Sequence, residues 1–249
     1  MHFGGKRFLI DPMLADQGAY PEVPETTSTG RGNPDCDLPC PVESLFDVDA
    51  VIVTHLHFDH FDEVAAKVLP KALTLFSQSE EEAQILRGMG FDDVRVLSGE
   101  GIAFDDVRLY RTKCDHGSSN LVTVDGYKDR GLTEKASGVV FESAAETERF
   151  YLAGDTIYCQ LVVDAVEKFK PGIVAVNAAG AQHPLGHLII MNQYDVRSLM
   201  RRFPTLKVIA THVEGVSHAT VNRPMLREFA KANQLDQLFV PNNGEVLEF

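Results

Sequence analysis

Three histidines and one aspartate lie within six residues of the stretch "VIVTHLHFDH", namely His55, His57, Asp59 and His60. Neighbouring imidazoles repel one another when they are protonated, so a positive partner is needed to hold these side chains together. Neutral imidazole and carboxylate are the ligands that zinc and related divalent metals prefer. A shared dication keeps the rings in the neutral form that donates a lone pair. Surface histidines at a strand end are the plain alternative, but they do not account for this density. The stretch therefore predicts a metal centre.

The strand before this stretch determines where its side chains point. Residues 49–54, "DAVIVT", are apolar and β-branched, and they predict a buried strand. Residues two apart in an extended chain point the same way, so His55 and His57 are predicted to bind one ion. Asp59 and His60 follow where the chain turns, which lets them face a second ion nearby.

The rest of the chain predicts a mixed α/β layered domain, β-rich at first and alternating between strand and helix in the last hundred residues. Further strands are predicted at residues 6–12, 73–77, 93–98, 101–113 (two strands joined at Asp105-Asp106), 137–143, 149–155, 173–179, 207–212 and 238–249. Helices are predicted at residues 61–69, 77–90 (with Ser79 and Glu82 at capping-box spacing), 161–170, 193–203 and 223–233.

Two connecting segments are long or rich in turn residues. Residues 15–44 contain many Pro, Gly, Thr and Ser residues, and the loop at 180–190 contains Gly and Pro. Long loops at strand ends usually carry function, so we expect both to border the metal site. That they only cover the core or an oligomer contact remains an open alternative.

The composition of the chain argues against some classes of function. The 249 residues include 44% hydrophobic and 24% charged side chains, which is typical of a globular protein with a real core. A net charge of -13 argues against binding to nucleic acid. No apolar run of about 18 residues is present, so no membrane span is expected. The N-terminus lacks the pattern of a secretory signal, which favours the cytoplasm. The sequence leaves open whether the chain forms a homo-oligomer.

The four cysteines do not indicate a disulfide framework in a chain of this size. Cys36 and Cys40 have the spacing of half a metal knuckle, but no second pair completes it. Cys159 follows the "LAGDT" stretch and is expected to be a small buried hydrophobe.

The stretch at 55–60 resembles the H-x-H-x-D-H signature of the metallo-β-lactamase superfamily, and the resemblance covers essentially the whole chain. Later landmarks of that superfamily are matched in order by His116 in "KCDHGSSN", Asp155 in "FYLAGDT" and His212 in "KVIATHVEG". The early "FLIDP" is similar to the superfamily's first acidic turn. The resemblance implies one domain over 1–249 with the four-layer αββα sandwich of that superfamily. Its usual first strand is missing here, so either the sequence is truncated or that strand is dispensable.

The resemblance also implies a set of metal ligands for two divalent ions. His55, His57 and His116 would bind the first ion, Asp59, His60 and His212 would bind the second, and Asp155 would bridge them. The ions are expected to be zinc, with manganese or iron as alternatives. A turn role for Asp155, a strand-end role for His212 and a loop role for His116 are the alternative interpretations. His183, His187 and His218 are expected to be loop residues near the ions, with contact to substrate as the alternative function.

The resemblance implies hydrolysis by a hydroxide generated between two metal ions, with Asp59 orienting the nucleophile. The phrases "FLIDP", "SGVVFE" and "LAGDT" are similar to bacterial zinc-dependent hydrolases related to the ascorbate-6-phosphate lactonases. This implies a small-molecule ester, lactone or phosphoester as substrate. Two other hypotheses remain: an iron-containing redox protein on the same fold, and a domain that binds without catalysing.

Overall fold

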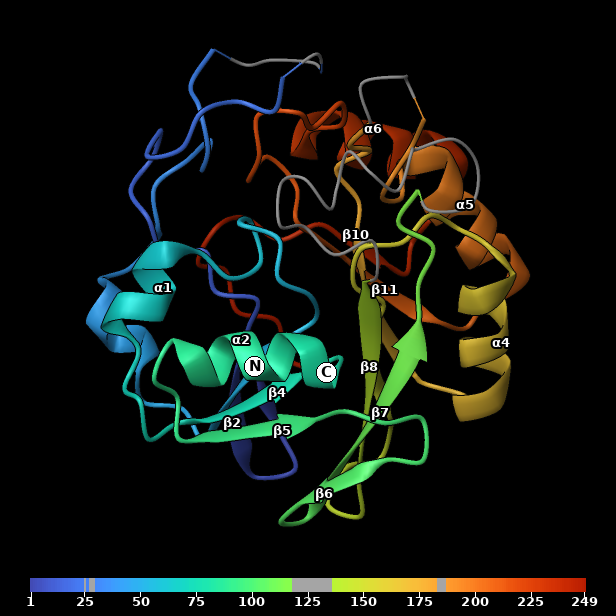
Figure 1. The fold of residues 1–249 in the computed structure, drawn as a ribbon. Helices are drawn as coiled ribbons and strands as arrows, with labels where there is room; N and C mark the ends of the chain where they lie inside the picture. The colour runs from blue at the N-terminus through green and yellow to red at the C-terminus, as the bar shows by residue number, and fades with distance from the viewer. Residues whose placement is uncertain (25, 27–29, 118–135, 183–186) are drawn as a thin grey trace.

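The computed structural model describes all residues except 25, 27–29, 118–135 and 183–186. Two β-sheets lie face to face, and helices cover the outer face of each sheet (Figure 1). The predicted αββα sandwich is thereby confirmed. None of the helices in the described part of the chain is long and apolar enough to cross a membrane.

The first sheet has the strand order β1-β2-β3-β4-β5. Its strands are β1 (His2–Phe3), β2 (Lys6–Ile10), β3 (Ala50–Val53), β4 (Thr74–Ser77) and β5 (Asp93–Val96). Strands β2 to β5 are parallel, and the two-residue β1 pairs with β2 in the antiparallel direction. All four residues of β3 are buried, as expected for a strand whose two faces are both covered.

The second sheet has the order β12-β11-β10-β9-β8-β7-β6. Its strands are β6 (Ile102–Phe104), β7 (Val107–Lys113), β8 (Ser137–Ser143), β9 (Phe150–Leu152), β10 (Ile173–Asn177), β11 (Lys207–Thr211) and β12 (Leu238–Phe239). Strands β9 to β12 are parallel, whereas β6 to β9 follow one another in antiparallel pairs. The strand predicted over 238–249 is limited to its first two residues.

The helices begin and end close to the predicted positions. They are α1 (Glu63–Val68), α2 (Glu80–Gly88), α4 (Gln160–Phe169), α5 (Gln193–Arg202) and α6 (Arg223–Asn233), and a 3-10 turn, η1, covers Val42–Leu45. The side chain of Ser79 accepts a hydrogen bond from the N–H of Glu82, which confirms the predicted cap of α2. The side chain of Glu82 also accepts from Gln78 and from the N–H of Leu56, next to the histidine stretch.

Three apolar clusters hold the layers together. Between the sheets, Phe8 of the first sheet packs against Phe141 of the second, with ring centroids 5.3 Å apart. A second cluster joins the outer face of the first sheet to α1 and α2, around Leu75 and Leu86. A third joins the second sheet to α4, α5 and α6 and includes Val174. Burial of these side chains is the main force that keeps the sheets in fixed relative positions.

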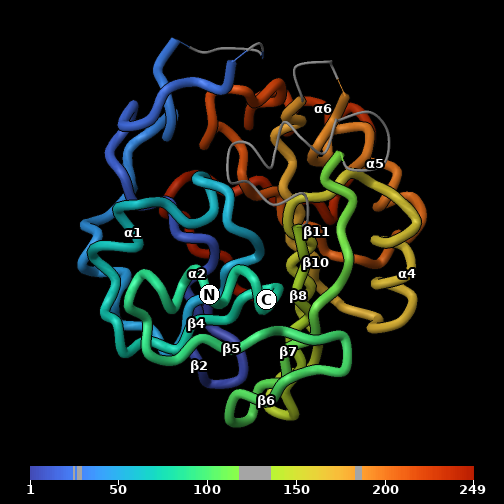
Figure 2. Tube along the Cα trace, in the orientation of Figure 1, coloured from blue at the N-terminus to red at the C-terminus, as the bar shows by residue number. Residues whose placement is uncertain are grey.

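Several strands end at one rim of the sandwich. Strands β2 and β3 run parallel in the first sheet, and β9, β10 and β11 run parallel in the second. Strand β7 points the same way as β9, because both are antiparallel to β8. The first described residues after each of these strands therefore lie at the same rim of the two sheets, as the trace in Figure 2 shows.

Candidate metal centre

The connection from β3 to α1 supplies the side chains of the first sheet. The ring of His55 lies 4.3 Å from that of His57 and 4.1 Å from that of His60, measured between centroids. The loop is tied to the second sheet, since Ser137 donates a hydrogen bond to the carbonyl of Thr54. Such close imidazoles cannot all be protonated, which supports the interpretation drawn from the sequence.

The second sheet supplies three side chains, His116 after β7, Asp155 after β9 and His212 after β11. A glycine is required before Asp155, because Gly154 has a φ of +69° and a Cβ there would clash with the backbone of Ser137. His212 itself has a φ of +57°, a left-handed conformation that non-glycine residues rarely adopt. Backbone strain of this kind is concentrated at functional sites.

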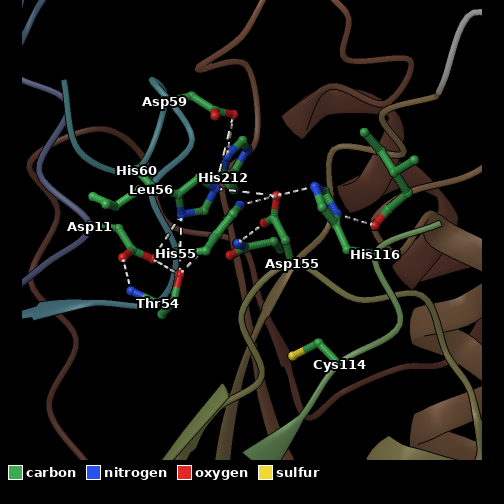
Figure 3. A network of polar contacts seen from close by, with 12 residues as sticks. Asp11, Thr54, His55, Leu56, Asp59, His60, Cys114, His116, Asp155 and His212 are labelled. Atoms are coloured by element: carbon green, nitrogen blue, oxygen red, sulfur yellow. Dashed lines mark hydrogen bonds and ion pairs between the residues drawn. The ribbon is translucent and has the colours of Figure 1, made fainter. Parts of the chain in front are cut away.

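The seven predicted ligands form two groups. One contains His55, His57 and His116, and the other contains Asp59, His60, Asp155 and His212; within each group the ligand atoms lie within 4.8 Å of one another. Asp155 lies between the two groups (Figure 3). Its Oδ2 is 3.2 Å from Nε2 of His60 and 3.6 Å from Nε2 of His116. The structure thus brings together every predicted ligand, and metal binding by them stays a prediction.

The side chains fit a metal ion because two of their buried ring nitrogens make no hydrogen bond to a described residue. Nε2 of His55 and Nε2 of His60 are buried without a hydrogen bond in the described part of the chain. Nδ1 of His116 lies 2.8 Å from the carbonyl of Ile189, so it must carry the proton and donate it. That bond leaves Nε2 of His116 as a free lone pair directed at Asp155. A histidine ligand held by its other nitrogen is the usual arrangement in metal sites.

The electrostatics describe a centre that needs positive charge. Burial lowers the pKa of His55 well below its usual value, and positive charge on His60 and His57 adds to this effect. Burial likewise lowers the pKa of His57 to about 4. For Asp155, burial is the largest single influence and raises the pKa, but the nearby histidines His60, His116 and His212 together outweigh it and hold the pKa well below the usual range. The carboxylate stays ionised, as a ligand must be.

Two residues that the sequence analysis did not single out orient the ligands. Asp11, directly after β2, has its Oδ2 2.8 Å from Nδ1 of His60 and accepts a hydrogen bond from the Thr54 hydroxyl at 2.8 Å. That hydroxyl lies 3.1 Å from Nδ1 of His55. Asn177, at the end of β10, donates to Oδ1 of Asp155 at 2.5 Å. In the sequence, the acidic turn in "FLIDP" indicated Asp11, whereas no pattern indicated Asn177.

We expect Asp11→Asn to weaken binding at the second ion's position by about 10- to 100-fold. Asparagine tolerates the left-handed φ of +46° at this position, so the backbone should be kept. Its amide N–H would donate to Nδ1 of His60, moving the ring proton to Nε2 and removing the lone pair. Titration calorimetry with zinc measures the change.

Asp49→Asn is the matched control, because Asp49 accepts from the N–H of Arg7 at the opposite end of β2. It should bind metal as the unaltered chain does. Equal loss in both variants would assign the effect to the sheet and not to the orientation of His60.

The predicted substrate-contact residues are placed differently. His183 lies outside the described residues, and His187 is exposed. His218 is buried, and its pKa responds to charges on members of both ligand groups. Contact of these residues with substrate stays a prediction.

The two long segments lie next to the centre. In the segment 15–44, the ring of Tyr20 contacts Phe58, which stands between His57 and Asp59, at 5.9 Å between centroids. In the loop 180–190, the carbonyl of Ile189 accepts from His116. Described residues of both segments thus reach the surroundings of the ligands, and their role in substrate access stays a prediction.

Comparison with known proteins finds a matching family model and a similar bacterial protein. A family model described as "Beta-lactamase superfamily domain" matches residues 6–213. The UPF0173 protein YddR of Bacillus subtilis is 38% identical, with 99% of this chain and 94% of that protein covered.

Two solved structures are also similar to this chain over nearly their whole lengths. The isothiocyanate hydrolase from Delia radicum gut bacteria superposes with a TM-score of 0.93 at 36% identity, covering 100% of this chain and 95% of that one. A possible metal-dependent hydrolase from Veillonella parvula superposes with a TM-score of 0.88 at 34% identity, covering 98% and 93%.

Proposed function

The chain belongs to the beta-lactamase superfamily of metal-dependent hydrolases, and we propose that it holds two zinc ions and hydrolyses a small molecule. The observation that carries the proposal is the position of Asp155. Its Oδ2 faces His60 of one ligand group and both His55 and His116 of the other, at 3.2 to 3.8 Å. A carboxylate shared in this way suits two ions better than one.

Two divalent ions held about 3.5–4 Å apart lower the pKa of a water and polarise the bond to be cleaved. The role of the chain's own residues is to hold the ligands in place and to orient the nucleophilic water. Asn177 fixes one oxygen of Asp155, which leaves the other oxygen for the two groups. Asp59 has a side chain 8% exposed, with Oδ2 3.4 Å from Nε2 of His212. From there Asp59 is suited to accept a hydrogen bond from the nucleophilic water and to aim it.

One similar solved structure supports a proposal for the substrate class. The similar protein from Delia radicum gut bacteria is an isothiocyanate hydrolase, and the alignment leaves almost no part of either chain unmatched. We therefore propose an isothiocyanate as the first candidate substrate, ahead of the small esters, lactones and phosphoesters that the sequence suggested. The balanced reaction is R–N=C=S + H2O → R–NH2 + COS. Oxygen bonds to the central carbon, the carbon–nitrogen bond breaks, and both protons of water end on nitrogen.

The test combines metal analysis with a substrate panel. We expect protein purified without chelator and supplied with zinc to hold two ions per chain by mass spectrometry. It should hydrolyse benzyl isothiocyanate faster than a γ-lactone, p-nitrophenyl acetate or p-nitrophenyl phosphate, with benzylamine released.

The other possible results of this test lead to different conclusions. At most one ion, with none added back, would contradict the dinuclear centre. Two iron ions with reversible reduction would favour the redox alternative. Two zinc ions without turnover of any member of the panel would favour a binding domain. Fast turnover of the lactone or a phosphoester alone would keep the hydrolase and replace the substrate class.

A further inference from the structure

His212 is supported differently from His60, the other histidine of its ligand group. Nδ1 of His60 is held by Asp11, whereas Nδ1 of His212 is buried without a hydrogen bond in the described part of the chain. On the other side of the ring, Nε2 of His212 lies 3.4 Å from Oδ2 of Asp59, as Figure 3 shows. Because Nδ1 has no described partner to set the direction of the ring, that direction depends on the backbone that carries it.

The backbone at His212 is strained at two places close together. His212 has a φ of +57° and Glu214 a φ of +63°, both in the left-handed region that residues with a Cβ rarely adopt. Such conformations persist only where the surrounding structure prevents them from relaxing. A change in φ at His212 would also turn its Cβ and its ring. The turn 212–214 therefore needs contacts that keep it in this conformation.

The carboxylate of Glu214 ties this turn to the start of α6. Its Oε1 accepts a hydrogen bond from the backbone N–H of Arg223 at 3.1 Å, and its Oε2 accepts from Nη1 of the same residue at 2.6 Å. An acidic group is favoured at the N-terminal end of a helix, where backbone N–H groups lack partners within the helix. Two bonds from one residue fix the orientation of the carboxylate as well as its position.

The C-terminal segment holds Arg223 in place. Nε of Arg223 donates to the carbonyl of Pro241 at 2.7 Å, and its Nη2 donates to Oδ1 of Asn243 at 2.5 Å. All three nitrogens of the guanidinium are thus engaged, and the side chain is only 16% exposed. A planar guanidinium with bonds in three directions is a more rigid support than a single-point cation. The turn 212–214 is therefore anchored to a group that cannot easily move.

Building on the dinuclear centre proposed above, we propose that Arg223 is a positioning residue that holds His212, through Glu214, in the direction needed to bind the second ion. It takes for His212 the role that Asp11 takes for His60, but it acts through the backbone and not on the imidazole. A loosened turn would let His212 leave the second ligand group. The first group is unaffected, because none of its three histidines lies on this turn.

The test measures the affinity of each zinc ion by titration calorimetry. Arg223→Met keeps the length and the apolar stem of the side chain but removes the guanidinium. We expect it to weaken binding of the second ion by about tenfold, as loss of a residue that orients a ligand does. Binding of the first ion should be unaltered. The ratio of the two affinities is the informative quantity, since general loss of structure would weaken both ions.

Glu214→Gln gives a second and independent measurement. The amide keeps the size of the side chain but has one acceptor oxygen for the two donors of Arg223, so a smaller loss at the second ion is expected. If the two residues act as one unit, Glu214→Gln combined with Arg223→Met should lose no more than Arg223→Met alone. Glu214→Gln also answers the question if Arg223→Met does not fold.

Arg227→Met is the matched control. Arg227 also lies on α6, and it donates to the same C-terminal segment, at 2.7 Å to the carbonyl of Val240 and at 2.8 Å to Oδ1 of Asn242. Both arginines thus join α6 to this segment, but Glu214 bonds to Arg223. Arg227→Met should bind both ions as the unaltered chain does.

The outcomes separate this proposal from the function on which it rests. The role of Arg223 is overturned if Arg223→Met or Glu214→Gln binds the second ion as tightly as the unaltered chain, if both ions weaken equally, or if Arg227→Met loses as much. An unaltered chain that takes up only one ion would contradict the dinuclear centre and this proposal with it. The expected losses without turnover of any substrate in the panel would reject the hydrolase and keep the role of Arg223.

Discussion

Replacing Asp155 by alanine is expected to lower the turnover number by several orders of magnitude and to leave fewer than two ions per chain. The carboxylate faces histidines of both ligand groups, at 3.2 Å from His60 and 3.6 Å from His116. Its removal takes away a carboxylate oxygen that lies within 3.8 Å of histidines from both groups. It also strands the amide of Asn177 without its acceptor. Metal analysis and steady-state kinetics on the same preparation measure both effects.

The control for this variant is Asp164→Ala, which removes a carboxylate from the exposed face of α4. It should keep both ions and full turnover. The circular dichroism spectra of the two variants should match, because Asp155 does not belong to any of the apolar clusters. Two ions and unaltered turnover in Asp155→Ala would mean that the centre is not built around this residue.

The variant Asp59→Asn should separate metal binding from catalysis. The amide keeps the size of the side chain but loses the anionic acceptor that would aim the nucleophilic water. We expect the turnover number to fall by about 10²- to 10⁴-fold, the range for removal of a general base. The first ion should stay bound, because His55, His57 and His116 are unaltered. The second is expected to bind more weakly, since Asp59 lies 3.4 Å from His212 within that group.

The companion variant is Glu63→Gln, which removes a negative charge four residues further on, at the exposed start of α1. It should leave the turnover number unaltered and so exclude a general effect of charge. If Asp59→Asn, saturated with both ions, turned over as fast as the unaltered chain, then Asp59 would not aim the nucleophile. The ligand role of Asp59 would then have to be judged from metal content alone.

Local sequence pattern was sufficient for the mixed α/β class and for the ligands at 55–60, whereas the αββα sandwich was implied by the resemblance to a family. Strand β3 reads as an apolar run because both of its faces are covered, and Ser79 marks a helix start whose cap is formed in the structure. The density of His and Asp at 55–60 pointed to a metal before any fold was known. His116, Asp155 and His212 depended on the resemblance to a family, since nothing local distinguishes them from turn residues.

The contacts of the supporting residues were not predictable, because they arise from strand pairing, although "FLIDP" indicated an acidic turn at Asp11. Asp11 reaches His60 only because β2 and β3 are parallel neighbours. Asn177 reaches Asp155 only because β9 and β10 are parallel neighbours. The support of His116 comes from a backbone carbonyl, which every residue has and no sequence pattern reveals. Such contacts across strands need the register of the sheet, which depends on the whole chain.

The division of the ligands between the two sheets has a mechanical consequence. Four come from the connection after β3, and three come from loops of the second sheet. An ion bound in this centre would therefore act as a cross-link at the open rim, where the apolar layer between the sheets stops. The unfolded chain can offer only the local four, so the full set of ligands exists only when the sandwich is closed. The free energy by which an ion would stabilise the closed sandwich must then equal the free energy by which closure strengthens binding of the ion.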